Sequence, residues 1–303
     1  MGKRSRKDVQ EFERHLMTNL FVLHERLMNG TYRHDSYSAF VIADPKSRSI
    51  HKASVADRVL HRAIYRALYP FFDKTFIADS FSCRENKGTH RALDRFTVFA
   101  RKASKNYRKT AWVLKCDIRK FFASIHHGIL LSILDERIED KRIVGLLSVV
   151  IESFSSGERN VGLPLGNLTS QLFSNVYMNE LDQFVKHRLG VKYYIRYADD
   201  FVFLSRDRNE LQRTLYIVND FLIRRLRLFL HPSKVFLKTV SSGVDFLGWV
   251  HFPKHRVLRV ATKRRMLRAL SADDVGQSTF ASYQGMLQHG NAFSIAQSIL
   301  KDA

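Results

Sequence analysis

Cysteine is scarce in this sequence, and long apolar runs are missing. The two cysteines, Cys83 and Cys116, are too few for a disulfide scaffold or a zinc site. No stretch is long and apolar enough to span a bilayer, and no apolar signal-peptide core follows the initial Met-Gly-Lys-Arg. These absences predict a soluble protein of a reducing compartment.

Acidic residues are also scarce relative to basic ones. The sequence contains 29 Asp and Glu and 50 Lys and Arg, which gives a net charge of +21. The excess of basic residues is spread from Lys3 to Lys301. Such a charge favours a polyanionic partner, with nucleic acid first and an anionic membrane surface second. The content of 45% hydrophobic and 26% charged residues is typical of a globular chain. We find no internal repeat, low-complexity block or linker, so we expect subdomains of one compact body.

Hydrophobic periodicity and turn residues predict mixed helices and short strands. We expect a helix over 8–29 that ends at Gly30, and another from the N-cap Ser54 to Tyr69 that is stopped by Pro70. Further helices are expected from about Thr89, over 126–135, 139–154, 168–189 and 207–227, and from about 256 onward. Strands are expected in a hairpin over 36–52 that turns at 44–48, over 112–117, in a hairpin over 193–204, and in short runs up to Trp249.

Three carboxylates occupy positions where a negative charge is costly. Asp117 ends an apolar strand, and Asp199 and Asp200 stand side by side at the tip of the 193–204 hairpin. A cation could compensate them, and Mg²⁺ is the first candidate because it binds one or two carboxylates together with substrate phosphates. The alternative is a solvated turn, because Asp is a common turn residue.

Two glycine-containing segments could approach a ligand closely. Gly88 lies in a polar, basic loop over 81–90, and a Gly-Leu-Pro-Leu-Gly turn at 162–166 precedes a long helix. Ordinary connecting loops are the alternative for both.

The order of these signals resembles the successive motifs of reverse transcriptases from about residue 50 to 250. The resemblance rests on the strand that ends at Asp117, Gly-Leu-Pro-Leu-Gly-Asn-Leu-Thr-Ser-Gln at 162–171, Tyr-Ala-Asp-Asp at 197–200, Lys234, and Phe-Leu-Gly-Trp at 246–249. Within that superfamily, the segment from Leu165 to Gln171 looks like the diversity-generating retroelement branch, whereas group II intron and retron enzymes usually carry Gln-Gly and end the motif in Ser-Pro.

The resemblance implies an α+β, right-handed polymerase fold. Fingers would occupy mainly 1–110, a palm with an antiparallel sheet and inserted finger or palm helices 111–255, and a short helical thumb 256–303. From the short stretch of the sequence after Trp249 we expect no RNase H, maturase or endonuclease domain.

The resemblance also implies roles for single residues. Asp117 and Asp199 would be the main ligands of two Mg²⁺ ions, with Mn²⁺ as a substitute, and Asp200 would be the third palm carboxylate. Lys234 would lie near the leaving pyrophosphate. Two metal ions held by carboxylates suit nucleotidyl transfer because they activate the primer 3′-oxygen and stabilise the leaving phosphate.

The nucleotide and primer sites follow in the same way. Phe122, five residues after Asp117, would exclude a 2′-hydroxyl by contact, with a plain core phenylalanine as the alternative. Residues implied to contact the nucleotide are Arg58, Arg84, Ile118, Phe122, Leu165, Gly166 and Gln171. Residues implied to grip the primer are Phe246, Leu247, Gly248 and Trp249.

The implied function is an RNA-directed DNA polymerase that copies a template RNA into adenine-mutagenised cDNA. Its implied partners are the template RNA, an RNA/DNA primer–template duplex, deoxynucleoside triphosphates and an accessory variability protein, with no membrane. The implied location is the cytoplasm of a prokaryote, for a cellular or phage-encoded protein. One alternative is a stand-alone, retron-like or phage-defence reverse transcriptase, and another is a non-catalytic RNA-binding protein with a polymerase-like palm.

Overall fold

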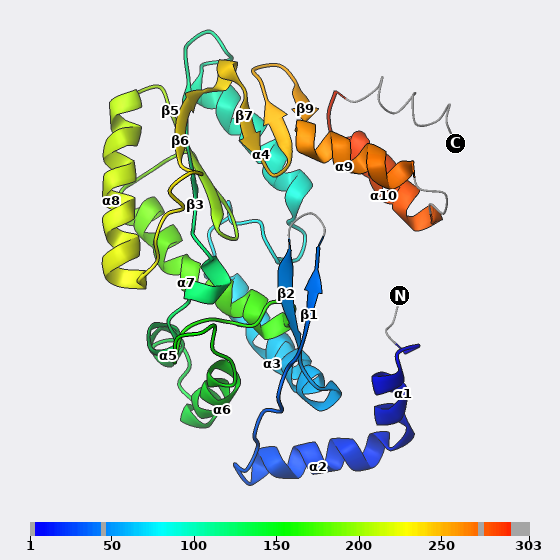
Figure 1. The fold of residues 1–303 in the computed structure, drawn as a ribbon. Coiled ribbons are helices and arrows are strands. Elements are labelled where there is room, and N and C mark those ends of the chain that lie inside the picture. Colours follow the sequence, from blue (N-terminus) through cyan, green and yellow to red (C-terminus); the bar gives the residue numbers. More distant parts are fainter. Residues whose placement is uncertain (1–3, 44–46, 272–275, 292–303) are drawn as a thin grey trace. The chain divides into compact units, whose positions relative to one another are not determined.

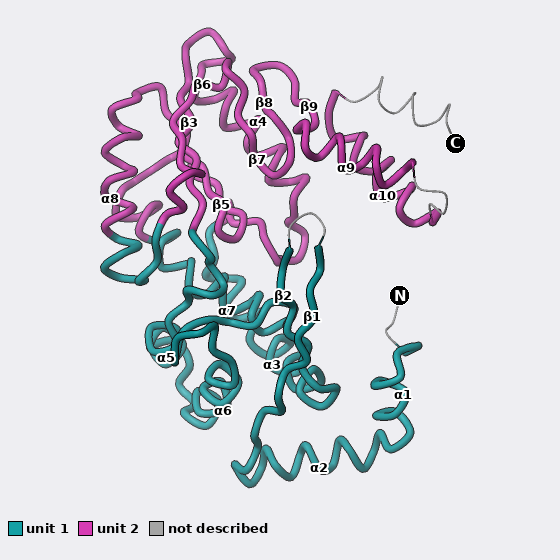
Figure 2. The backbone as a smooth tube through the Cα atoms, in the orientation of Figure 1, with its two compact units in different colours: residues 1–77, 119–183, 221–229 teal, residues 78–118, 184–220, 230–303 magenta. Residues whose placement is uncertain are grey.

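The computed structural model describes residues 4–43, 47–271 and 276–291. The chain divides into two compact units, which Figure 2 shows in separate colours. The first unit contains residues 1–77, 119–183 and 221–229, and the second contains residues 78–118, 184–220 and 230–303. Because the chain passes between the units several times, neither unit is one continuous segment.

The first unit is mainly helical and carries one hairpin. Its elements are α1 (Lys7–Arg14), α2 (Leu16–Met28), β1 (Ser38–Ile42), β2 (Arg48–Lys52), α3 (Val55–Asp73), the short helix η1 (Phe121–Ser124), α5 (His127–Asp135), α6 (Lys141–Glu152) and α7 (Leu168–Gln183) (Figure 1). β1 and β2 are antiparallel, with Phe40 opposite Ile50, which confirms the predicted hairpin. Residues 44–46 of its predicted turn lie outside the described residues.

Helix α7 carries the core of this unit. Most of its side chains are buried, and it packs against α3 and α5. The Gln183 side chain donates a hydrogen bond to the Thr75 carbonyl at 2.8 Å. A helix that is buried on nearly all sides is a central element of the core. The turn at 162–166, which precedes α7, is therefore restrained at its C-terminal end by this helix.

Two predictions in this unit are wrong in detail. The expected single helix over 8–29 is broken at His15, whose backbone (φ −121°, ψ 35°) is not helical. Ser54 does cap α3 by accepting a hydrogen bond from the Asp57 N–H, as predicted, but α3 continues through Pro70 to Asp73. Proline removes one backbone hydrogen bond, and burial of Tyr69 and Phe72 stabilises the last turn instead.

The second unit contains two antiparallel sheets. Its elements are α4 (Thr89–Ala103), β3 (Trp112–Asp117), the π-helical turn η2 (Phe184–Arg188), β4 (Tyr194–Tyr197), β5 (Asp200–Ser205), most of α8 (Arg208–Leu226), β6 (Phe236–Thr239), η3 (Val240–Ser242), β7 (Val244–Phe246), β8 (Trp249–His251), β9 (Arg256–Leu258), α9 (Val260–Leu270) and α10 (Gln277–Leu287). The strand orders are β4-β5-β3-β6 and β7-β8-β9. The predicted strand over 112–117 and hairpin over 193–204 are confirmed.

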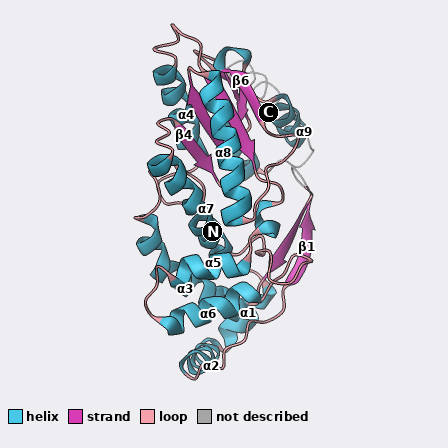
Figure 3. Cartoon of the chain, turned by 90° about the vertical axis from the view of Figure 1, so that its left-hand side faces the viewer, coloured by secondary structure: helices cyan, strands magenta, loops and turns pink. Residues whose placement is uncertain are grey.

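Helices cover both faces of the four-stranded sheet. α4 packs against β4 and β5, and α8 runs along the opposite face, as Figures 1 and 3 show. Alternate residues of β3 and β5 point to opposite faces: Val113, Val202 and Leu204 join the α4 cluster, while Leu114 and Phe203 are buried on the other side. The sheet is therefore rigid where β3 and β5 end.

The C-terminal part of this unit begins with a strand rather than with the predicted helix. β9 precedes α9, and its Leu258 is buried in the same cluster as Phe246 and Trp249. The helical character expected after 256 is confirmed by α9 and α10. The assignment of 1–110, 111–255 and 256–303 to fingers, palm and thumb stays a prediction. No helix within the described ranges is long and apolar enough to cross a membrane.

Candidate active site

A strained two-residue turn presents Asp199. Tyr197 pairs with Asp200 across β4 and β5, so Ala198 and Asp199 alone form the turn. Ala198 has φ 54°, at the first central position that glycine usually occupies in such hairpins. An alanine in this left-handed conformation costs roughly 1 kcal/mol, so the surrounding structure must stabilise the turn.

The register of the sheet brings the other two carboxylates beside this turn. Asp117, the last residue of β3, lies directly opposite Asp200, the first residue of β5. The Ile118 N–H donates a hydrogen bond to the Asp199 carbonyl at 3.2 Å. The three predicted metal ligands and Ile118 therefore meet at one end of the four-stranded sheet.

Two lysines pair with the carboxylates. Lys115 Nζ lies 3.1 Å from Asp200 Oδ2, and Lys234 Nζ lies 2.6 Å from Asp117 Oδ1. Burial raises the pKa of Asp200 to about 7, and Lys115 opposes this shift. Lys234 was predicted as a site residue, and the structure joins it directly to the acid that ends β3.

The donor set suits a divalent metal chemically, although the arrangement is not a metal cage. Among the described residues, no group of three or more His, Cys, Asp and Glu side chains is arranged to hold a metal ion. Carboxylate oxygens are the ligands that Mg²⁺ prefers, and Asp200 Oδ1 is buried with no hydrogen-bond partner in the described part of the chain. The unused acceptor on Asp200 is available for a cation.

Arg196 supports the turn from inside the sheet. Its side chain is fully buried. Nη1 donates to the Ala198 carbonyl at 3.1 Å, and Nη2 donates to Ser80 Oγ at 3.0 Å. Sequence reasoning did not identify Arg196 or Lys115, although each is a charged residue inside an otherwise apolar strand, which is the signal that could have found them.

Arg84 and the predicted primer grip belong to this same unit. Arg84 Nη1 donates to the Ser80 carbonyl at 3.0 Å, so Ser80 contacts both Arg84 and Arg196. The primer-grip segment is the β7–β8 hairpin, in which Phe246 pairs with Trp249. Its two turn residues, Leu247 (φ 50°) and Gly248 (φ 86°), both have positive φ, as the tightest hairpin turns require.

The remaining predicted nucleotide residues belong to the first unit. Arg58 pairs with Asp8 at 2.6 Å. Phe122 contacts Phe121 edge-on, and its carbonyl accepts a hydrogen bond from the Leu163 N–H at 2.7 Å. Gln171 lies in α7.

Leu165 and Gly166 are fixed against β2 within the first unit. The Leu165 carbonyl accepts a hydrogen bond from the His51 N–H at 3.0 Å. A Cβ on Gly166 would lie 2.8 Å from Ile50 Cγ2, and Gly166 has φ 102°. Only glycine fits this position. The carboxylates, Lys234, Arg84 and the primer-grip hairpin thus lie in one compact unit, while Arg58, Phe122, Leu165, Gly166 and Gln171 lie in the other.

The chain that carries these residues matches a known family. Residues 43–251, more than half of the chain, match the family model "Reverse transcriptase (RNA-dependent DNA polymerase)". The chain belongs to the reverse transcriptase family.

Relatives in sequence include bacterial and intron-encoded proteins. Protein YkfC of Escherichia coli (strain K12) is 26% identical over 300 residues, which covers 84% of this chain and 75% of that protein. The group II intron-encoded protein LtrA of Lactococcus lactis subsp. cremoris is 23% identical over 169 residues, which covers 53% of this chain and 27% of that protein. Nuclear intron maturase 4, mitochondrial, of Arabidopsis thaliana is 26% identical over 165 residues, 52% of this chain and 20% of that protein.

Solved structures of telomerase share the fold. Apo telomerase from Candida tropicalis, truncated from its C-terminal domain, has a TM-score of 0.57 at 11% identity and covers 81% of this chain and 60% of its own. Telomerase from the same organism in complex with a TWJ fragment of telomeric RNA has a TM-score of 0.57 at 10% identity, covering 93% of this chain and 56% of its own. The chain thus spans three fifths or less of these telomerase chains. The predicted α+β polymerase fold with antiparallel sheets is confirmed.

Proposed function

We propose that this chain is an RNA-directed DNA polymerase that adds deoxynucleotides to a primer on an RNA template. The observation that carries the proposal is the meeting of Asp117, Asp199 and Asp200 at one sheet end: Asp117 and Asp200 are held by the strand register, and Asp199 by the turn between β4 and β5. Membership of the reverse transcriptase family supports the same chemistry.

Each residue of this sheet end has a proposed role. Asp117, Asp199 and Asp200 would hold two Mg²⁺ ions, which when bound supply Lewis-acid stabilisation of the transferring phosphoryl group. The protein itself orients the carboxylates. Lys234, now paired with Asp117, would place positive charge near the leaving pyrophosphate, and Lys115 would balance the half-buried Asp200.

Residues for nucleotide selection are proposed from the motifs. Phe122 would exclude a 2′-hydroxyl by contact, and Arg58 and Arg84 would contact the triphosphate. Ile118, Leu165, Gly166 and Gln171 would line the nucleotide site. The hairpin Phe246–Trp249 would grip the primer; positive φ at both of its turn residues is typical of a tight two-residue hairpin turn.

Primer extension tests the proposal. The full chain, an annealed RNA template with a DNA primer, Mg²⁺ and deoxynucleoside triphosphates should yield extended primer, and Asp117→Asn should not. Absence of extension with the unmutated chain over a range of Mg²⁺ and Mn²⁺ concentrations, while RNA is still bound, would favour the second candidate function below.

A finer proposal concerns the biological type. We infer from the segment Leu165–Gln171 alone that the enzyme is of the diversity-generating retroelement type, copies its template with errors at adenines and works with an accessory variability protein. A stand-alone, retron-like or phage-defence enzyme is the rival. The neighbouring genes distinguish the two alternatives. A template and variable repeat pair with an accessory gene would indicate the diversity-generating type, and a structured retron RNA would indicate the retron-like type.

A second candidate function is RNA binding without polymerisation. It is favoured by two observations: two of the three carboxylates are paired with lysines, and one relative is named as an intron maturase. Under this candidate the site would be a structural ion-pair cluster.

A further inference from the structure

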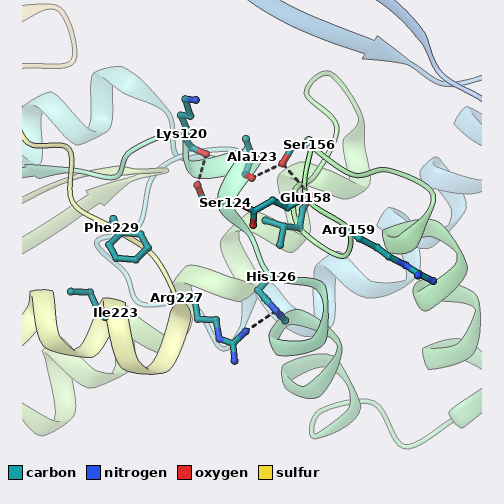
Figure 4. Close-up of a pocket in the computed structure, with 11 residues that line it drawn as sticks. Lys120, Ala123, Ser124, His126, Ser156, Glu158, Arg159, Ile223, Arg227 and Phe229 are labelled. Atoms are coloured by element: carbon teal, nitrogen blue, oxygen red, sulfur yellow. Dashed lines mark hydrogen bonds between the residues drawn. The ribbon is translucent and has the colours of Figure 1, made fainter.

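A hollow of about 640 Å³ lies within the first unit, and none of the predicted site residues lines it. It is formed by the segment around η1, the loop 156–161 and the end of α8. Figure 4 shows Phe229 and Ile223 on one side of it and Ser156 and His126 on the other. Its volume lies in the range of pockets that take a small organic ligand or one nucleotide, about 300–1,000 Å³.

The lining carries more positive than negative charge. Three cationic residues, Lys120, Arg159 and Arg227, and one acidic residue, Glu158, line it, and Figure 4 shows the Lys120 and Arg159 side chains pointing away from the hollow. Within the described ranges Lys120, Arg159 and Glu158 form no ion pair or side-chain hydrogen bond. The hollow therefore offers the Arg227 guanidinium for an anion and the Glu158 carboxylate for a hydrogen-bond donor.

Arg227 and His126 are arranged as a donor pair. Arg227 Nη1 donates to His126 Nε2 at 3.0 Å, as Figure 4 shows. Burial, and then Arg227, lower the pKa of His126, so the ring is neutral and carries its proton on Nδ1. That Nδ1 is buried with no hydrogen-bond partner in the described part of the chain.

The backbone at two of these cations is strained. Lys120 has φ 46° and Arg227, the first residue after α8, has φ 50°. Both positions are left-handed, and the position after a helix is usually occupied by glycine. Long side chains kept in such conformations are a recognised mark of functional sites.

The opposite wall is apolar and open. The Phe229 side chain is 57% exposed and Ile223 is 38% exposed. The Phe229 backbone is fixed by a hydrogen bond from the Arg119 N–H to its carbonyl at 2.9 Å. A fixed, exposed aromatic ring next to cations is the combination that binds single-stranded nucleic acid by stacking and charge.

We propose that this hollow binds one nucleotide of a single-stranded RNA segment, through residues other than those proposed for the polymerase site. The base stacks on Phe229, the phosphate is held by Arg227, and Glu158 accepts a hydrogen bond from the 2′-hydroxyl or a base amine. The carboxylate favours RNA over DNA, because the 2′-hydroxyl is the donor that DNA lacks. The proposal goes beyond the polymerase function and holds for either candidate function above.

Fluorescence anisotropy with a labelled, unstructured RNA of about 12 nucleotides tests the site. The full chain is used without Mg²⁺ or deoxynucleotides, so that catalysis plays no part. Phe229→Ala should weaken binding at least about fivefold. Arg227→Asn, chosen because Asn tolerates positive φ, should weaken binding and make the log–log salt slope shallower by about one.

Two control variants remove the same groups outside the hollow. Tyr216→Ala removes an exposed aromatic residue of α8, and Arg225→Ala removes an exposed cation of the same helix. Both should bind RNA within about twofold of the unmutated chain. Circular dichroism of each variant verifies folding.

Crosslinking of the unmutated chain gives a second readout that no folding defect can affect. A thiouridine-containing RNA should crosslink to the peptides that hold 119–124 and 223–229, and an equal DNA should do so less. The proposal is overturned if Phe229→Ala and Arg227→Asn bind like their controls, if crosslinks map only elsewhere, or if free AMP displaces the RNA at equal nucleotide concentration.

Discussion

Arg196 Nη1 donates a hydrogen bond to the carbonyl oxygen of Ala198 at 3.1 Å. Ala198 is the strained residue of the turn that presents Asp199, and Arg196 is fully buried. Its second nitrogen, Nη2, reaches Ser80 Oγ. The planar guanidinium therefore fixes the turn carrying Asp199 to the segment before Arg84.

Arg196→Lys should slow nucleotide addition more than it weakens nucleotide binding. A lysine ammonium cannot donate to the Ala198 carbonyl and Ser80 Oγ with the fixed, planar geometry of a guanidinium. Misplacing a catalytic group by about 1 Å can lower the rate about a hundredfold. We expect kcat to fall roughly tenfold to a hundredfold with KM for the deoxynucleotide little changed, measured by single-nucleotide addition. The matched control is Arg95→Lys, which alters the partly exposed pair between Arg95 and Asp79. Equal losses of kcat in both variants would remove the positioning role.

Phe122→Ala should admit ribonucleotides. The Phe122 backbone is held by the Leu163 N–H, so removal of the ring should leave the chain in place and open only the space for a 2′-hydroxyl. The ratio of deoxynucleotide to ribonucleotide incorporation should fall well below that of the unmutated chain. Phe71→Ala, which removes a half-exposed ring of α3, is the control. An unchanged ratio would mean that Phe122 is an ordinary packing residue.

Leu165→Gln should reduce misincorporation more than it reduces total synthesis. The Leu165 carbonyl is bonded to the His51 N–H, so the substitution changes the side chain on a fixed backbone. A Gln can hydrogen-bond near the nucleotide, whereas Leu offers only shape, and about 1.4 kcal/mol of discrimination is tenfold in error rate. Sequencing of cDNA made on one template compares the variant with the unmutated chain and with Leu165→Met. Equal error opposite adenine in all three would argue against any role of Leu165 in fidelity.

His251 should make the fold less stable in acid. Burial, with a contribution from Arg256, lowers the pKa of His251 to about 3. The ordinary pKa of histidine is 6.5. As the pH falls below this value, His251 becomes protonated in the unfolded chain but stays neutral in the folded chain. The free energy of unfolding therefore falls by up to about 1.4 kcal/mol per pH unit from this group, until the pH reaches about 3.

His251→Phe should reduce that loss. Urea unfolding at about pH 6.5 and about pH 4.5 should show a smaller difference for the variant than for the unmutated chain. His255→Phe, at an exposed histidine, should behave like the unmutated chain. Parallel pH dependences for all three proteins would assign the acid sensitivity to other groups.

The sequence allowed the centre of the site to be predicted because the signals there are local. An acid at the end of an apolar strand and two acids at a hairpin tip must lie at sheet ends, and antiparallel pairing then places Asp117 opposite Asp200. The motif order assigned Lys234, which the structure joins to Asp117.

Features that depend on tertiary packing were not predictable in the same way. Pro70 predicted a helix end, but burial of Phe72 extends the helix past it. Arg196 and Lys115 stand out in the sequence as charges inside apolar strands, but a strand pattern gives no sign of what a buried charge contacts. Asp8 holds both Lys52 and Arg58, and a pairing so distant along the chain leaves no local signal.

The central claim is that the carboxylates at the end of β3 and β5 carry out nucleotidyl transfer, and Asp199→Asn tests it most directly. Asparagine keeps the size of the side chain and removes the charge. Single-nucleotide addition to a DNA primer on an RNA template should fall by orders of magnitude, while RNA binding and the Asp207→Asn control, at an exposed acid of the same unit, stay near the unmutated values. Addition by Asp199→Asn at the unmutated rate would contradict the account.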